Sequence, residues 1–127
     1  MALEPMFSLA GRVALVTGGG RGIGAGIAQS LAKAGADVVV ADYTQDLVDA
    51  GSKAVAAIGV RSAAIVVDVR EAASVRAMVD AVERQFARLD IAVNNAGIVS
   101  LGAVEQLTVP QWDDVIDVNL RGVFLCC

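Results

Sequence analysis

Four short runs of apolar residues recur along the chain, and a segment with helical periodicity follows each of them. The runs cover residues 13–17, 38–41, 64–67 and 91–94, and they are rich in valine, alanine and isoleucine. None of them alternates between polar and apolar side chains, which is typical of strands that are covered on both faces. We therefore predict four strands of a buried parallel sheet, separated by helices.

Three of the helices are predicted over residues 23–34, 46–58 and 72–86. Gly35 and Gly59 are expected to end the first two, because glycine readily adopts the conformation that closes a helix. The first has one apolar stripe, formed by Ile23, Ile27, Ala28, Leu31 and Ala32. The third has the clearest periodicity, with one apolar face formed by Val75, Met78, Val79, Val82 and Phe86.

A fourth helical pattern follows the last strand and continues to the final residue. Thr108 and Gln111 have the spacing of a capping box, and Pro110 is tolerated in a first helical turn. No residue that would end a helix follows Phe124. The order β-α-β-α-β-α-β-α predicts an α/β fold, a doubly wound parallel sheet with right-handed crossovers that is truncated after its fourth strand and the following helix.

Composition restricts the classes of protein to consider. The chain has 127 residues, of which 56% are hydrophobic and 19% charged, with a net charge of -4. This describes one globular domain and excludes a disordered segment or a basic nucleic-acid-binding arm. The absence of histidine excludes a Ser-His-Asp triad and a histidine-ligated metal site, so we expect no metal.

Cysteines and apolar stretches indicate where such a protein would work. Cys126 and Cys127 are adjacent, and they provide neither a disulfide framework nor a zinc site, which favours a reducing cytoplasm. No apolar stretch reaches the roughly 18 residues of a membrane span, and the first residues lack the basic start of a signal peptide. We therefore expect a cytoplasmic protein without a membrane partner.

A glycine-rich loop follows the first predicted strand and precedes the first helix. Its pattern is T-G-x-x-x-G-x-G, with Thr17, Gly18, Gly22 and Gly24 at the fixed positions. Gly18 allows a tight turn, Gly22 lets a diphosphate approach the backbone, and Gly24 allows close packing of helix on strand. The helix N-terminus then offers free N–H groups to phosphate oxygens. These glycines match neither G-x-G-x-x-G nor a Walker loop.

An aspartate closes the second predicted strand. Asp42 lies eighteen residues after Gly24, where dinucleotide-binding folds place the acid that hydrogen-bonds the ribose hydroxyls. A simple turn aspartate would occupy the same place, but the position favours the ribose role. A carboxylate there repels a 2′-phosphate and favours NAD, whereas Arg21 in the glycine loop could bind that phosphate. We give Asp42 more weight and predict NAD, with NADP as the alternative.

With these motifs the sequence resembles the short-chain dehydrogenase/reductase family. T-G-x-x-x-G-x-G is that family's cofactor motif, and N-N-A-G at residues 94–97 is identical to another of its motifs. D-V-N-L at residues 117–120 resembles the segment with the family's catalytic asparagine, and D-V at residues 68–69 its adenine-binding pair. The resemblance implies a Rossmann-type NAD(P)-binding domain over residues 1–127, the cofactor-binding portion of an oxidoreductase whose catalytic half is absent.

The resemblance also implies a role for each matching residue. The implied cofactor-binding residues are Gly18, Arg21, Gly22, Ile23, Gly24, Asp42, Tyr43, Asp68, Val69, Asn95, Ala96 and Gly97. Within this set the glycine loop holds the pyrophosphate, Asp42 the adenosine ribose and Asp68 the adenine amino group, while residues 95–97 line the cofactor's path. Asn119 is the implied catalytic residue, because the family's asparagine at this place holds a water in the proton relay.

The family's catalytic Ser and Tyr-x-x-x-Lys are absent from these 127 residues. Tyr43 is the single tyrosine, and Lys33 and Lys53 belong to other helices, so we expect this chain to be inactive by itself. In a complete protein the implied reaction is hydride transfer between nicotinamide and an alcohol or ketone, commonly in a homo-oligomer. If 127 residues are the whole gene product, the alternative is a non-catalytic NAD-binding or subunit-pairing module. An S-adenosylmethionine-dependent methyltransferase would share the glycine loop and the acid, but it gives no reason for N-N-A-G.

The truncation carries an expectation about stability. The fourth strand would become a sheet edge, and the last helix would lose most of its packing surface. We therefore expect the isolated chain to be marginally stable and prone to associate.

Overall fold

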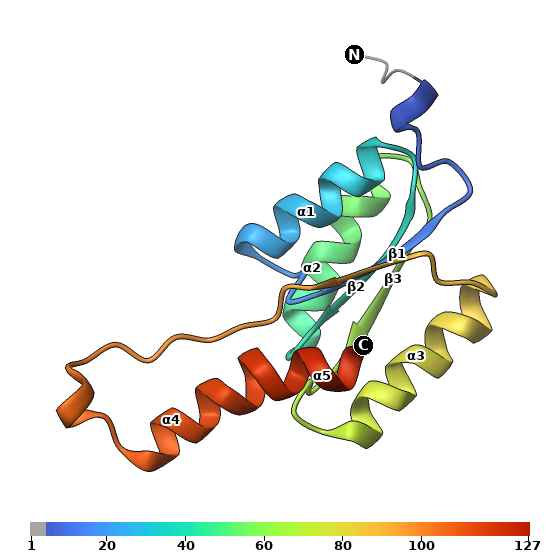
Figure 1. Ribbon diagram of the computed structural model, residues 1–127. Coiled ribbons are helices and arrows are strands. Elements are labelled where there is room, and N and C mark those ends of the chain that lie inside the picture. Colours follow the sequence, from blue (N-terminus) through green and yellow to red (C-terminus); the bar gives the residue numbers. More distant parts are fainter. Residues whose placement is uncertain (1–4) are drawn as a thin grey trace.

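The computed structural model describes residues 5–127 and contains a parallel sheet between two layers of helices (Figure 1). Its strands are β1 (Val13–Thr17), β2 (Asp37–Asp42), β3 (Ser62–Val66) and β4 (Ile91–Asn94), in the order β3-β2-β1-β4. Strand β1 pairs in parallel with both β2 and β4. The four predicted strands are confirmed, with ends that differ by at most two residues.

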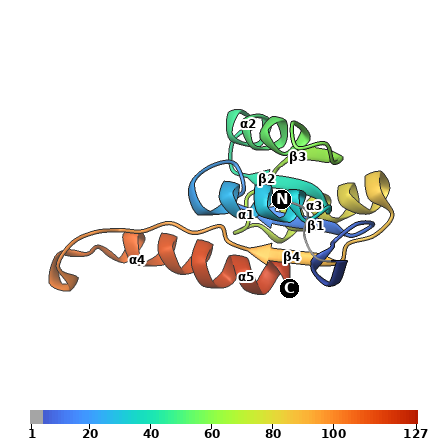
Figure 2. The same cartoon turned by 90° about the horizontal axis from the view of Figure 1, so that it is seen from above.

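The helices follow the strands in the predicted order. They are α1 (Gly22–Lys33), α2 (Gln45–Ala56), α3 (Ala72–Phe86), α4 (Val109–Ile116) and α5 (Gly122–Cys126). Two short 3₁₀ turns, η1 (Pro5–Phe7) and η2 (Val104–Gln106), and a π-helical segment, η3 (Asp117–Arg121), complete the described chain. Seen from above, α2 and the helix pair α4–α5 lie on opposite sides of the sheet (Figure 2).

Two hydrophobic cores cover the two faces of the sheet. On one face, Ala14 and Val16 of β1 pack with Ala28 of α1 and Val55 of α2. On the other, alternate residues of β1 and β2 pack against α3, in a core formed by Val13, Leu15, Val39, Ala41, Ala63, Val67, Val69, Val75, Met78 and Val82. Because neighbouring strand residues point to opposite faces, the unbroken apolar runs of β1 and β2 supply both cores.

Burial on both faces is confirmed for the central strands and is wrong for the outer ones. Every residue of β1 is buried, as are the four middle residues of β2. In contrast, Val66 at the end of β3 is 47% exposed, and Ala92 in β4 is exposed. Strands β3 and β4 are the edge strands of the sheet in the described chain, so no second neighbouring strand shields their side chains.

Two residues of the predicted apolar stripes do not face a core. Ile23 is 79% exposed, because α1 begins at Gly22 and its first turn projects beyond the sheet. Val79 in α3 is 38% exposed, whereas Met78 next to it is buried. In α1 the alanines Ala28 and Ala32 are buried in the core, whereas the larger Ile27 and Leu31 are only partly buried against it.

The last helical segment begins as predicted, but it is not one continuous α-helix. The Thr108 N–H donates to Gln111 Oε1 at 2.8 Å, and the Gln111 N–H donates to Thr108 Oγ1 at 3.4 Å, which forms the capping box. After Ile116 the helix widens into the π-helical segment η3. No residue of α4 is buried, and α4 and the segment before it extend away from the sheet (Figure 1).

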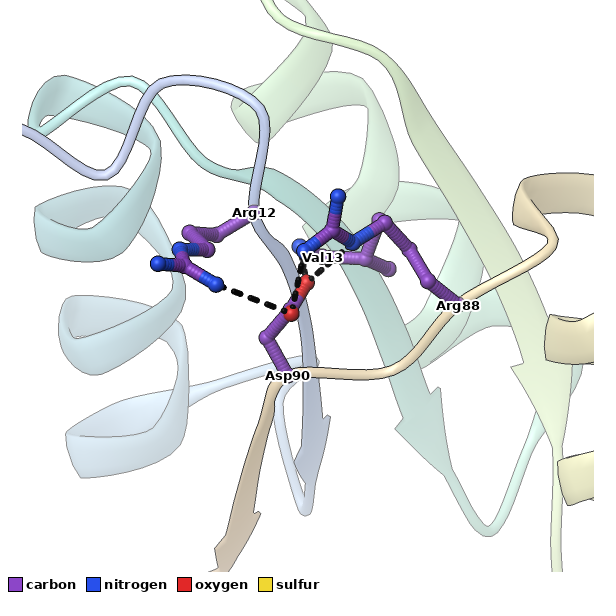
Figure 3. A network of polar contacts seen from close by, with 4 residues as sticks. All are labelled: Arg12, Val13, Arg88 and Asp90. Atoms are coloured by element: carbon purple, nitrogen blue, oxygen red, sulfur yellow. Dashed lines mark hydrogen bonds and ion pairs between the residues drawn. The ribbon is translucent and has the colours of Figure 1, made fainter.

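A polar network holds the amino ends of β1 and β4 together (Figure 3). The Asp90 carboxylate accepts the Val13 N–H at 2.8 Å and two bonds from the Arg88 guanidinium at 2.8 and 2.7 Å. Arg12 adds a longer bond of 3.4 Å. The Arg88 guanidinium and the Val13 N–H hold the pKa of Asp90 well below its usual range.

Among residues 5–127, no helix combines the length and the apolar character that crossing a bilayer requires.

Candidate functional site

A cavity of about 840 Å³ opens at the carboxyl ends of the strands. The chain leaves β1 toward β2 on one side, whereas β4 lies on the other side, so this is the switch point where open α/β sheets bind ligands. All the predicted cofactor residues line it, namely Gly18, Arg21, Gly22, Ile23, Gly24, Asp42, Tyr43, Asp68, Val69, Asn95, Ala96 and Gly97. The structure thus brings together residues from four separate stretches of sequence.

The glycine loop forms one wall of this cavity. Gly18 and Gly22 have φ values of +63° and +56°, a left-handed conformation that glycine adopts without strain. A side chain at Gly24 would collide with the Gly18 carbonyl and the Asn95 side chain, so only glycine lets α1 start so close to β1. No side chain caps α1, which leaves its first-turn N–H groups for an anion.

Thr17 and Asn95 join the glycine loop to the segment after β4. The buried Thr17 hydroxyl accepts the backbone N–H groups of Asn95 and Ala96 at 3.2 and 3.1 Å, and it donates to the Val93 carbonyl at 3.3 Å. The Asn95 side-chain amide donates to the carbonyls of Thr17 and Gly18, both at 3.1 Å. These five bonds set the spacing between two walls of the cavity.

Asp42 lies at the end of β2, with both carboxylate oxygens bonded to backbone. One oxygen accepts the Gly20 N–H at 2.9 Å, and the other accepts the Tyr43 N–H at 2.7 Å. A carboxylate has about four acceptor positions, so Asp42 keeps capacity for two hydroxyl donors. The two backbone bonds therefore hold the Asp42 carboxylate in a fixed orientation beside the glycine loop.

Asp68 and Arg70 form a second charged group, at the end of β3. The Arg70 guanidinium donates to the two oxygens of Asp68 at 2.9 and 2.8 Å. These hydrogen bonds lower the pKa of Asp68 and raise that of Arg70. The guanidinium also lies 5.9 Å from the centre of the Tyr43 ring, at the outer limit of a cation–π contact.

Asn119 lies in the π-helical segment and does not line the cavity. Its side-chain oxygen accepts the Ile98 N–H at 2.8 Å, and its side-chain nitrogen donates to the Ile98 carbonyl at 2.9 Å. Asn119 therefore fixes the segment that follows N-N-A-G. Its role in holding a catalytic water stays a prediction.

Several residues of the site were not anticipated from the sequence. Arg70, Thr44, Leu47, Val67, Ile98, Asp114 and Val118 also line the cavity. Gly20 and Gly51 allow the loop to lie against α2, since a side chain at Gly20 would come within 2.6 Å of the Leu47 carbonyl. A glycine inside an amphipathic helix, as at Gly51, was a usable signal for this close approach.

The arrangement suits an anionic ligand with hydroxyl and amino groups. The loop and helix N-terminus provide donors for a diphosphate, and Asp42 provides acceptors for hydroxyls. Within residues 5–127, no cluster of three or more potential metal-ligating side chains occurs.

Comparisons with known proteins agree with these features. The family model for short chain dehydrogenases matches residues 12–127. An uncharacterised oxidoreductase of Methylorubrum extorquens is 43% identical over 122 residues, which are 94% of this chain and 49% of that protein. The D-threitol dehydrogenase of Mycolicibacterium smegmatis is 44% identical over 125 residues, which are 95% of this chain and 46% of that protein.

Solved structures show the same fold. A short-chain type dehydrogenase/reductase from Mycobacterium marinum has a TM-score of 0.91 at 38% identity, covering 94% of this chain and 47% of the other. An NAD⁺-bound xylitol dehydrogenase has a TM-score of 0.89 at 30% identity, covering 92% and 45%. The chain spans about half the length of the relatives it matches. Because the family model covers nearly all of it, and its motifs surround one cavity, this chain belongs to the short-chain dehydrogenase/reductase family.

Proposed function

We propose that this chain is the dinucleotide-binding portion of an NAD-dependent oxidoreductase that interconverts an alcohol and a ketone. The convergence of the glycine loop, Asp42 and residues 95–97 on one cavity carries the proposal. An uncapped helix N-terminus after a glycine turn suits a diphosphate. The spare acceptor positions of Asp42 suit ribose hydroxyls.

Each part of the site has its own task. When bound, the nicotinamide ring exchanges a hydride with the carbon atom that bears the substrate oxygen. The glycine loop binds the diphosphate, Asp42 orients the ribose, and Asp68 accepts the adenine amino group. Asn119 positions the segment after N-N-A-G through Ile98, and we retain its role in holding a water as part of the proposal. The tyrosine and lysine that move the proton to the substrate oxygen would come from outside these 127 residues.

The preference for NAD rests on the fixed charge of Asp42. Backbone N–H groups of Gly20 and Tyr43 orient its carboxylate, so it cannot easily turn away from a 2′-phosphate. Repulsion between these two anions disfavours NADP. Arg21 is exposed at the same cavity and is the residue that would counter this effect.

Calorimetric titration of the purified protein with NAD and with NADP tests the proposal. We expect saturable binding with NAD about tenfold tighter or more, which corresponds to about 1.4 kcal/mol. Asp42→Asn should reduce the ratio of the NAD affinity to the NADP affinity. Asp46→Asn should leave this ratio unchanged, because Asp46 is an exposed residue of α2 outside the cavity. If the wild-type protein binds NADP more tightly than NAD, the proposed preference for NAD is wrong. Weaker NADP binding by Arg21→Gln would then show that Arg21 causes the preference for NADP. A folded protein that binds neither dinucleotide contradicts the proposal.

A non-catalytic module for NAD binding or subunit pairing is the second candidate. It is favoured by β4, which pairs only with β1 in the part of the chain that the structure describes. A free strand edge can accept a strand from another chain. Sedimentation across a concentration range tests subunit pairing, and a protein that stays monomeric throughout contradicts that part of the candidate.

The cell compartment and the oligomeric state of the protein are part of the same proposal. The cysteines Cys126 and Cys127 are both free, which fits the reducing cytoplasm. Trp112 in α4 and Phe124 in α5 are 59% and 76% exposed, which fits a homo-oligomer in the complete protein.

A further inference from the structure

The acceptor capacity of Asp68 is almost fully used by one neighbour. Its Oδ1 accepts both the backbone N–H and the side-chain Nε–H of Arg70, at 3.0 and 2.9 Å. Its Oδ2 accepts one bond, from Arg70 Nη2 at 2.8 Å. A carboxylate oxygen has two lone pairs, so one acceptor position, on Oδ2, is left.

The bidentate ion pair between Arg70 and Asp68 also fixes where that remaining acceptor position lies. Two parallel N–H···O bonds hold a carboxylate and a guanidinium in one plane, which a single bond cannot do. The backbone bond from Arg70 adds a third constraint on the same carboxylate. The Asp68 side chain therefore cannot rotate to meet a donor that approaches from another direction.

The pair lies within the cavity that the proposed cofactor would occupy. Both residues line it, and their side chains are only 25% and 35% exposed. Tyr43 and Asp114 also line the cavity there, and their electrostatic effect favours the charged form of Arg70. Nothing in T-G-x-x-x-G-x-G or N-N-A-G accounts for an arginine at this place.

We propose that Arg70 is a positioning residue that makes the site select an amino group over a carbonyl oxygen at the adenine end of the cofactor. This inference rests on the proposed function. Arg70 locks Asp68 so that a single Oδ2 lone pair faces the ligand, and an exocyclic amino group can donate to it. A purine with a carbonyl oxygen at that place presents a second acceptor, and the two oxygens repel each other.

The fixed orientation of the Asp68 carboxylate matters because a freely rotating carboxylate would discriminate less between adenine and hypoxanthine. Hypoxanthine replaces the amino group by an oxygen but gains a ring N–H donor one atom away. Without Arg70, Asp68 can rotate to accept that ring N–H. We therefore expect Arg70 to affect the choice between the two bases more than the affinity for either one.

The experiment compares NAD with nicotinamide hypoxanthine dinucleotide by calorimetry. We expect the wild-type protein to bind NAD about tenfold more tightly or more, because a hydrogen bond to a charged group is a strong one. Arg70→Met should reduce the preference to about threefold or less. Arg70→Lys should not restore it, since lysine keeps the charge but lacks the planar fork.

A matched control is available at the other end of the sheet. Arg88 forms the same two-pronged pair with Asp90, also two residues away, but outside the cavity. Arg88→Met should therefore leave the preference unchanged. In an Asp68→Asn background, Arg70→Met should have no further effect on the preference, because Arg70 acts through Asp68.

The outcomes separate this inference from the proposed function. If Arg70→Met binds both dinucleotides and keeps the wild-type preference, the inference is overturned and the proposed function stands. If the wild-type protein binds NAD without any preference, the inference is overturned in the same way. If the wild-type protein binds no dinucleotide, both are overturned.

Discussion

The Thr17 hydroxyl is the smallest group on which the site depends, so its removal provides a strong test. Thr17 is 2% exposed, and its hydroxyl makes three hydrogen bonds, which is the full capacity of the group. Thr17→Val keeps the shape of the side chain and deletes the hydroxyl. The Ala96 N–H then loses its acceptor, whereas the Asn95 N–H keeps a bond to the Val93 carbonyl at 3.1 Å.

The cost follows mainly from the Ala96 donor, because the Asn95 N–H and the Val93 carbonyl stay bonded to each other. A buried donor without a partner costs about 1–3 kcal/mol. Ala96 is half-buried, so water can partly replace its lost bond, while Asn95 and Val93 each lose a second partner. We therefore expect a loss of about 2 kcal/mol. Thr17→Ser keeps all three bonds and loses one methyl group, which costs about 1 kcal/mol.

Urea unfolding followed by circular dichroism measures these differences, and calorimetry with NAD measures the effect on the site. Thr17→Val should lower the free energy of unfolding by more than Thr17→Ser does, and should weaken NAD binding as well. Equal stability of the two variants would show that the hydroxyl does not hold the two walls of the cavity together.

Two further predictions concern a glycine and an ion pair. Gly24→Ala should abolish NAD binding and destabilise the fold by about 2 kcal/mol, since the new Cβ would collide with the Gly18 carbonyl. Gly26→Ala should stabilise the fold by about 0.5–1 kcal/mol, because a Cβ at Gly26 would meet no atom within 4 Å and alanine favours a helix. Thermal melts of the two variants check these opposite signs. The lowered pKa of Asp90 means that its stabilising effect is complete above the ordinary aspartate pKa of about 4 and is lost as the pH falls below it. The stability difference between the wild-type protein and Asp90→Asn should therefore shrink below pH 4, and a constant difference down to pH 2 would contradict the assignment.

Features with a local physical cause could be predicted from the sequence. The helix α3 has the predicted bounds, because its apolar spacing, and not a distant contact, defines it. The turn at Gly18 and the capping box at Thr108 are likewise set by residues within a few positions. The exposure of Ile23 was mispredicted, because helical spacing alone does not show where a helix passes beyond the sheet it covers.

Contacts between distant residues could not be predicted in the same way. Thr17 and Ala96 are 79 residues apart, and no pattern in either motif indicates that a hydroxyl joins them. Arg70 is close to Asp68 in sequence, yet only the turn after β3 brings its guanidinium onto both oxygens. The π-helical widening around Asn119 also has no signal in the apolar periodicity.

The position of N-N-A-G in this chain depends on polar bonds more than on burial. Strand β4 has four residues and pairs only with β1 among the described residues, and Ala92 in its middle is exposed. Asp90 holds its beginning to the Val13 N–H, and the Thr17 hydroxyl holds its end. Val13 and Thr17 are the two ends of β1, the strand that also leads into the glycine loop. Since both walls of the cavity are therefore anchored on one fully buried strand, they keep their spacing although the outer face of β4 is open.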